Sequence, residues 1–186
     1  MNKNKKTIMI DMDDVIVQGG FLALLNEYMG TNYIESDFKD FYMQDIVPDK
    51  RAFFDWFKTK NVYDYCHLAD NAKEVIEELV EKYDVYIGTS YIYRDIPNEC
   101  GYVLEQKYNY LLKELPFIST DKYIFIMNKS LLQTDIKIDD RIDNLTNTKR
   151  KILFSAYHNE SINEQELANE GIERAKDWLT IKNMLL

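Results

Sequence analysis

The segment Thr7–Ile10 is a short apolar run that leads directly into three carboxylates within four positions, Asp11, Asp13 and Asp14. Four apolar or β-branched residues without alternation predict a strand buried on both faces. Like charges at the end of such a strand repel one another, and each carboxylate resists leaving water. A divalent cation such as Mg²⁺, which prefers oxygen ligands, offsets both costs. The segment therefore predicts a metal-dependent site at the carboxyl end of a first strand.

Four more runs of apolar and β-branched residues predict further strands of the same buried kind. They span residues 84–88, 123–127, 136–138 and 151–154. Three other segments carry apolar residues at helical spacing, which predicts amphipathic helices. These helices span residues 71–82, with Asp70 as the expected N-cap, 97–115 and 164–185. Strands that alternate with helices predict a doubly wound α/β fold with a parallel, Rossmann-like sheet.

The region 18–68 departs from this alternation. It has no convincing buried strand, yet it is dense in Phe, Tyr and Trp. Aromatic side chains bury large apolar areas, so the region predicts a small helical insertion with a core of its own. A chain of 186 residues suits one domain with such an insertion. We therefore expect a catalytic core formed by residues 1–17 and 69–186, and a helical cap formed by residues 18–68.

The net charge of −9 argues against two classes of partner. A strongly acidic surface repels phosphate backbones and anionic lipids, so we expect neither polymeric nucleic acid nor a membrane surface as a partner. A small phosphorylated molecule remains compatible, because a metal and local cations override the global field. Cys66 and Cys100 lack the spacing of a metal or redox motif, and no apolar run approaches the ~20 residues that span a bilayer. These features predict a cytoplasmic protein with reduced thiols.

Polar side chains follow four of the predicted strands, at the point where each strand ends. Because the carboxyl ends of parallel strands meet at one edge of a sheet, we expect these groups to converge on one crevice. They supply paired carboxylates, two hydroxyls and one cation, which suits phosphoryl transfer. The groups are Asp11 with Asp13, Thr89 with Ser90, Lys129, and Asp139 with Asp140.

The order of these motifs resembles the haloacid dehalogenase (HAD) superfamily, whose phosphatases use an aspartate nucleophile. The matching pattern is Asp-x-Asp-x-Val from Asp11, then Thr-Ser, then Lys, then Asp-Asp. More narrowly, residues 10–13, 87–90 and 138–141 resemble the 5'(3')-deoxyribonucleotidases, and residues 157–159 match a further segment common in that family. Each motif is short, but their joint occurrence in this order covers essentially the whole chain. The resemblance implies a HAD-like core with a small helical cap inserted after the first strand.

The resemblance also implies a role for each matched residue. Asp11 is the expected nucleophile, which forms an aspartyl-phosphate, and Asp13 is the expected general acid and base. Thr89 and Ser90 are expected to hold phosphate oxygens. Lys129 is expected to bridge the phosphate and the nucleophile, which keeps the carboxylate ionised and in place.

A magnesium ion is the cofactor that the resemblance implies. Its expected ligands are the Asp11 carboxylate, the Asp13 backbone carbonyl and the Asp140 carboxylate, with water completing an octahedron. Asp139 is expected beside them, where it orients Lys129 or the metal's ligands. Asp14 departs from the family pattern, because a Gly is usual at this position. Its extra carboxylate either faces solvent or biases the hinge of the cap.

In the family the cap closes over the phosphate and stacks the nucleobase between aromatic rings. Stacking of a base on an aromatic ring contributes roughly 1–3 kcal/mol, enough to favour a nucleotide over a bare sugar phosphate. Phe41, Tyr42 and Met43 resemble the turn that contacts the base, and Phe57 is a candidate for a further wall. Gly19 and Gly20 are the candidate hinge of the cap.

The resemblance thus implies a Mg²⁺-dependent phosphatase that converts nucleoside monophosphates into nucleoside and phosphate, as a 5'(3')-deoxyribonucleotidase does. The base, the sugar, the position of the phosphate and the oligomeric state stay open, although a homodimer is common in related enzymes. One alternative is a HAD phosphatase for another small ester such as a sugar phosphate. Another is a phospho-receiver signalling module, in which the Lys lies on the last strand. Lys129 instead precedes Asp139 and Asp140, which favours the phosphatase.

Overall fold

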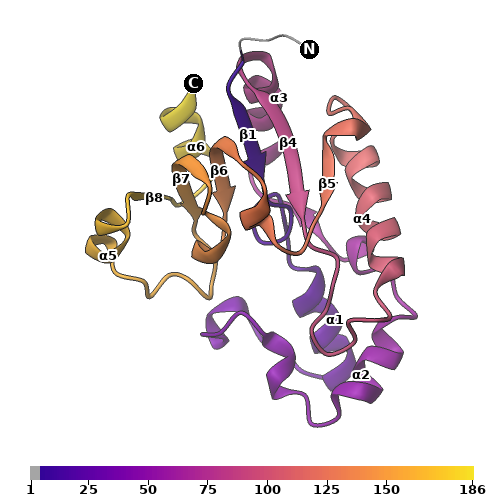
Figure 1. Cartoon of the computed structure of the whole chain (residues 1–186). Coiled ribbons are helices and arrows are strands. Elements are labelled where there is room, and N and C mark those ends of the chain that lie inside the picture. The colour runs from indigo at the N-terminus through magenta and orange to yellow at the C-terminus, as the bar shows by residue number, and fades with distance from the viewer. Residues whose placement is uncertain (1–4) are drawn as a thin grey trace.

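The computed structural model describes residues 5–186 and is built on a six-stranded parallel sheet (Figure 1). The strands lie side by side in the order β5-β4-β1-β6-β7-β8. Each neighbouring pair runs parallel, so the predicted doubly wound α/β sheet is confirmed. The strands are β1 (Thr7–Ile10), β4 (Asp84–Thr89), β5 (Tyr123–Phe125), β6 (Thr134–Asp139), β7 (Thr148–Phe154) and β8 (Ile172–Ala175).

The register of the central strands places their carboxyl ends next to one another. Ile10, the last residue of β1, lies opposite Ile87 of β4 and Ile138 of β6. All three side chains are buried, as expected for strands covered on both faces. The residues that follow these strands therefore emerge together at one edge of the sheet, which faces helices α1 and α2 in Figure 1.

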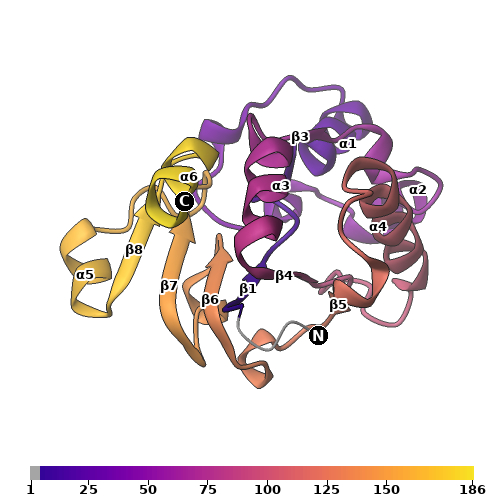
Figure 2. The same cartoon turned by 90° about the horizontal axis from the view of Figure 1, so that it is seen from above.

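Helices α3 (Ala72–Lys82) and α6 (Trp178–Leu185) pack against each other over one face of the sheet (Figure 2). Helix α4 (Gly101–Glu114) lies toward the β5 end of the sheet. The buried indole Nε1 of Trp178 donates a hydrogen bond to the carbonyl of Val15 at 2.9 Å. Helix α6 thereby anchors the loop that follows β1, which carries the acidic cluster.

Two predictions at helix ends are wrong. Helix α3 begins after Asn71 rather than Asp70, and Asn71 adopts a left-handed backbone with φ of 63°. The expected helix over 164–185 is divided into α5 (Glu164–Asn169), strand β8 and helix α6. Gly171 causes the division, because its φ of 68° ends α5 and turns the chain back into the sheet.

Residues 18–68, which we call the cap segment, form helices α1 (Gly20–Met29) and α2 (Lys50–Phe57) and three short 3₁₀ turns. The turns span Glu35–Asp37, Met43–Ile46 and Val62–Asp64. Strand β2 (Val17–Gln18) pairs antiparallel with β3 (His67–Leu68), so the chain enters and leaves the cap segment at one place. Gly20 is required there, because a Cβ would lie 2.6 Å from the carbonyl oxygen of Val62.

The aromatic residues of the cap segment form most of its own core. Phe53, Phe54 and Phe57 are completely buried, and Phe57 packs against Phe21 with 5.4 Å between ring centroids. The expectation that Phe57 forms a wall of the substrate pocket is therefore wrong, since it does not line the cavity described below. Within residues 5–186, no helix combines the length and apolarity needed to cross a membrane.

Candidate active site

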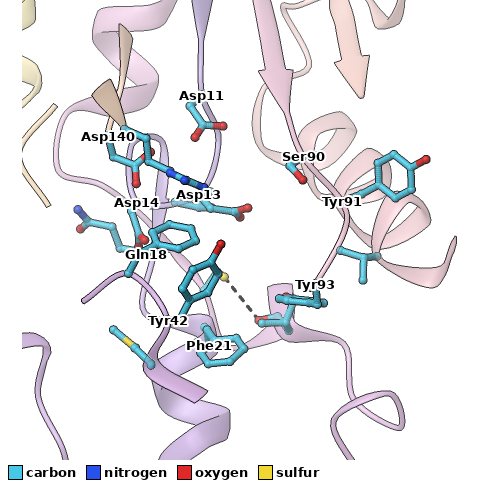
Figure 3. Close-up of a pocket in the computed structure, with 18 of the residues that line it drawn as sticks. Asp11, Asp13, Asp14, Gln18, Phe21, Tyr42, Ser90, Tyr91, Tyr93 and Asp140 are labelled. Atoms are coloured by element: carbon cyan, nitrogen blue, oxygen red, sulfur yellow. Dashed lines mark hydrogen bonds between the residues drawn. The ribbon is translucent and has the colours of Figure 1, made fainter. Parts of the chain in front are cut away.

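A cavity of about 270 Å³ lies between the carboxyl ends of the central strands and the cap segment. Figure 3 shows Asp11, Asp13 and Asp140 at one end of this cavity, with Phe21 and Tyr42 further along it. The residues that line it come from the loop after β1, from the cap segment, from helix α4 and from the loops after β4, β5, β6 and β7. The topology has thus brought distant parts of the chain to one site.

A buried lysine lies between two carboxylates at the inner end of the cavity. Lys129 Nζ is 2.7 Å from Oδ1 of Asp11 and 2.6 Å from Oδ2 of Asp139. Burial lowers the pKa of Lys129, but the adjacent carboxylates outweigh burial and hold this pKa above the ordinary lysine value. Lys129 is therefore a fixed positive charge beside Asp11.

The carboxylate of Asp11 has one oxygen engaged and one available. Its Oδ1 accepts hydrogen bonds from the backbone N–H of Met12 at 2.7 Å and from Lys129. Burial raises the pKa of Asp11, and the charge of Lys129 opposes that rise. The Oδ2 oxygen is left to face a phosphorus atom or a cation.

Asp139 and Asp140 have different surroundings. Asp139 accepts hydrogen bonds at Oδ1 from the backbone N–H of Arg141 and the side chain of Asn144, and at Oδ2 from Lys129. Its two oxygens are thus already used for positioning. Asp140 is also buried, and its Oδ2 lies 2.7 Å from Nε2 of His158. Asp140 therefore keeps an oxygen free for a cation.

Among residues 5–186, two groups of side chains have ligand atoms close enough to hold a metal ion together. One is Asp11, Asp139 and Asp140, and the other is Asp14, Asp140 and His158; within each group the atoms lie within 4.8 Å of one another. Burial, followed by the charges of Asp139 and Asp11, raises the pKa of Asp140 well above its usual range. A hard cation would reverse that rise by favouring the ionised form, so the donor set fits such an ion.

Asp13 extends into the cavity and is half-exposed, with 53% of its side chain accessible. Its Oδ1 accepts a hydrogen bond from the hydroxyl of Tyr63 at 2.8 Å, and its Oδ2 contacts Nζ of Lys107. Lys107 is buried and also donates to Oγ1 of Thr89 at 2.6 Å. The ammonium group of Lys107 therefore connects the end of β4 with the second carboxylate of the Asp-x-Asp pair.

The two predicted phosphate-binding hydroxyls are placed differently. Ser90 lines the cavity, and its Oγ accepts a hydrogen bond from the backbone N–H of Ile92. Thr89 is completely buried and does not line the cavity. Its contact with the site is the hydrogen bond that its Oγ1 accepts from Lys107.

Comparison with known proteins assigns the family. Residues 5–186 match the family model described as "5' nucleotidase, deoxy (Pyrimidine), cytosolic type C protein". The chain belongs to this nucleotidase family. The resemblance to the 5'(3')-deoxyribonucleotidases is thereby confirmed, and the chain is a nucleotide phosphomonoesterase.

Relatives and solved structures agree with the family. The chain is 31% identical over 184 residues to a 5'(3')-deoxyribonucleotidase of Clostridium acetobutylicum, which covers 96% of this chain and 94% of the relative. It is 30% identical over 190 residues to the 5'(3')-deoxyribonucleotidase of Bacillus subtilis, and this alignment covers 98% of this chain and 99% of the relative. A haloacid dehalogenase-like hydrolase of Streptococcus pneumoniae aligns with a TM-score of 0.50 at 14% identity. The alignment covers 99% of this chain and 100% of the hydrolase, and it supports the fold alone.

The side chain of Asp14 does not face solvent freely in the enzyme. Its side chain is partly buried beside Asp140 and His158, and its backbone φ of 58° lies in the left-handed region. Burial, followed by the charges of Asp13 and Glu35, raises the pKa of Asp14 to about 8. A Gly suits this backbone better, which is a physical reason for the usual family residue.

The far end of the cavity carries the predicted aromatic turn. Phe41, Tyr42 and Met43 all line the enzyme's cavity. The guanidinium of Arg94 lies 3.7 Å from the centroid of the Tyr42 ring, which fixes that ring in place. The carbonyl of Phe41 accepts a hydrogen bond from the hydroxyl of Tyr157 at 2.8 Å, which connects the cap segment with the core.

Sequence reasoning missed Lys107 and Tyr63, which hold Asp13. The sequence did indicate that Lys107 is buried, because it lies on the same face of α4 as the buried Val103, Tyr110 and Leu111. A lysine on the apolar face of an amphipathic helix is seldom buried without a partner. Tyr63 had no such signal, since it was one of many aromatic residues in the cap segment.

Proposed function

We propose that the enzyme is a Mg²⁺-dependent 5'(3')-deoxyribonucleotidase that acts through an aspartyl-phosphate at Asp11. The observation that carries the proposal is the buried ammonium of Lys129 between Asp11 and Asp139, with Asp13 across the same cavity. In this arrangement the charge of Lys129 favours the ionised form of one carboxylate for attack, and a second carboxylate lies across the cavity for the leaving group.

In the proposed first step, an oxygen of Asp11 attacks phosphorus while the bond from phosphorus to the nucleoside oxygen breaks. Asp13 gives a proton to that departing oxygen, and Lys129 and Ser90 neutralise and hold the phosphate oxygens. Asp13 then takes a proton from the water that attacks phosphorus, and Asp11 is released. The nucleoside and inorganic phosphate are the products.

The residues that would hold Mg²⁺ are Asp11 and Asp140 through their carboxylates and Asp13 through its backbone carbonyl. When bound, the ion would supply positive charge that neutralises the phosphate oxygens and aligns them for in-line attack. Asp139 would orient Lys129 rather than bind the ion, because its oxygens are already engaged. His158 would hold Asp140 in place.

The substrate we propose is a deoxynucleoside monophosphate, with its base placed against Tyr42 and Phe41. These residues lie beyond the carboxylates in a cavity of about 270 Å³, a size that suits a small molecule. The acidic net charge and the free thiols of Cys66 and Cys100 support a small substrate and a cytoplasmic location.

The test is release of inorganic phosphate from a panel of monophosphates, with Mg²⁺ and with EDTA. We expect turnover of dUMP or dTMP that EDTA abolishes, and slower turnover of sugar phosphates. Fast turnover of a sugar phosphate beside slow turnover of every deoxynucleotide would instead support the alternative phosphatase.

The variant Asp11→Asn tests the nucleophile in the same assay. It should reduce turnover by at least about 10⁴-fold and abolish the phosphoenzyme seen by mass spectrometry of acid-quenched enzyme. Asp121→Asn is the matched control, because Asp121 is an exposed carboxylate in a surface turn before β5. Unchanged turnover in Asp11→Asn would remove Asp11 from the mechanism.

A further inference from the structure

Tyr63 connects the end of the cap segment, just before β3, with the active site. It lies in the 3₁₀ turn Val62–Asp64, just before β3, and only 4% of the residue is exposed. Its ring packs against that of Tyr110 on α4, with 5.2 Å between centroids. Its hydroxyl donates to Oδ1 of Asp13 at 2.8 Å. The direction of this hydroxyl is thus set by packing against the core, not by the exposed carboxylate.

The other oxygen of Asp13 has a partner that a substrate would compete for. Lys107 contacts Oδ2 of Asp13 and lies 2.6 Å from Oγ1 of Thr89, at the end of β4. A phosphate monoester placed at that strand end brings negative charge to the same ammonium group. Tyr63 is neutral and gains much less from a phosphate. When Lys107 turns to the phosphate, the Tyr63 contact is therefore the one that remains on Asp13.

Tyr63 acts as a hydrogen-bond donor and not as an acid. Its hydroxyl lies 2.8 Å from Oδ1 of Asp13, where the carboxylate can only accept. A phenol ordinarily loses its proton only near pH 10, so the proton stays on Tyr63 in the pH range in which phosphatases work. With Oδ1 occupied in this way, Oδ2 is the oxygen of Asp13 that can carry the proton for the leaving group.

We propose that Tyr63 is a positioning residue that holds the general acid Asp13 with Oδ2 toward the leaving oxygen. The inference rests on the proposed function, in which Asp13 protonates the nucleoside. As the bond from phosphorus to the nucleoside oxygen breaks, its electron pair stays on that oxygen, which takes the proton from Oδ2. In the second step Oδ2 takes a proton from the attacking water, while the bond from phosphorus to Asp11 breaks.

The leaving group separates this role from a structural one. A nucleoside alkoxide is a strong base and needs a proton as it departs, whereas p-nitrophenolate is weakly basic and departs without one. Loss of alignment at Asp13 should therefore slow the first-step release of nucleoside and spare the first-step release of p-nitrophenolate, while hydrolysis of the shared aspartyl-phosphate slows for both esters. Damage to the fold, the phosphate site or the nucleophile would slow the first step of both esters alike.

The experiment is Tyr63→Phe, which removes one hydroxyl and keeps the ring that packs on Tyr110. We expect the single-turnover rate of nucleoside release from the fastest deoxynucleoside monophosphate to fall about tenfold or more. The single-turnover rate of p-nitrophenolate release should stay within about twofold of wild type, measured in the same way. Asp13→Asn should show the same selectivity with a larger loss.

Tyr110→Phe is the matched control, because it removes the hydroxyl of the neighbouring ring, which does not line the active-site cavity. It should leave both esters unchanged. An equal loss in the first-step rates of both esters in Tyr63→Phe, or an unchanged first-step rate on the nucleotide, would overturn the role of Tyr63 alone. A wild-type enzyme that hydrolyses no deoxynucleotide would overturn the proposed function first.

Discussion

The carboxylate of Asp14 should destabilise the metal-free enzyme. It is partly buried near Asp140 and His158, and its pKa is raised to about 8 by burial and by the charges of Asp13 and Glu35. The folded protein therefore holds the Asp14 proton more tightly than the unfolded chain does. Ionisation of Asp14 should cost stability as the pH rises from about 4 to about 8.

The size of this cost follows from the pKa and from the exposure of the side chain. A rise from 3.8 to about 8 corresponds to about 6 kcal/mol at pH 8 in a fully shielded site. Solvent reaches the partly buried Asp14, and screening reduces the cost to about 2 kcal/mol. Asp14→Asn removes the charge and should recover this amount. Asp14→Gly also removes the left-handed strain, about 1 kcal/mol, which is offset in part by the freedom of Gly in the unfolded chain.

Urea unfolding in EDTA at pH 4.5 and pH 8 measures the effect. Asp14→Asn should match wild type within about 0.5 kcal/mol at pH 4.5 and exceed it by about 2 kcal/mol at pH 8. Asp143→Asn is the matched control, because 88% of the Asp143 side chain is exposed. A gain that does not grow with pH, or a loss at pH 8, would refute the argument from charge repulsion.

Two further outcomes concern a surface carboxylate and a histidine. Asp135 accepts hydrogen bonds from Lys149 and from the backbone N–H of Thr7, which lower its pKa to about 2. Asp135→Asn should therefore cost about 1 kcal/mol at pH 7, and the difference, measured by urea unfolding, should vanish as the pH falls from about 4 toward 2. His158→Ala should raise the Mg²⁺ concentration for half-maximal activity about tenfold, because His158 holds Asp140; an unchanged Mg²⁺ titration would contradict that role.

The strands and the groups at their ends could be predicted because short buried runs and their polar termini are local features. Strand β8 could not, because Ile172–Ala175 has only four residues and is buried only at its two ends, which is too little to separate it from the flanking helical patterns. Gly171 was the residue that marked the break.

The side chains that contact Asp13 could not be predicted from local sequence patterns. Lys107 and Tyr63 reach Asp13 from α4 and from the end of the cap segment, 94 and 50 positions away in sequence. The prediction that Phe57 forms a pocket wall failed for a related reason. The spacing of aromatic residues in a helix does not distinguish a core from a pocket wall. Such contacts depend on how elements dock, which one sequence does not display.

The pairing of β2 with β3 makes the cap segment a replaceable unit. Both of its ends meet at Val17–Gln18 and His67–Leu68, so a different cap could be grafted there without altering the register of β1. Recognition would change with the graft, while Asp11, Lys129 and Asp140 would stay where they are. Tyr63, however, travels with the cap. A grafted cap that lacks a hydroxyl at the position of Tyr63 would bind its new ester and yet release the alcohol slowly. A change of cap therefore alters both the choice of substrate and the transfer of a proton to the leaving group.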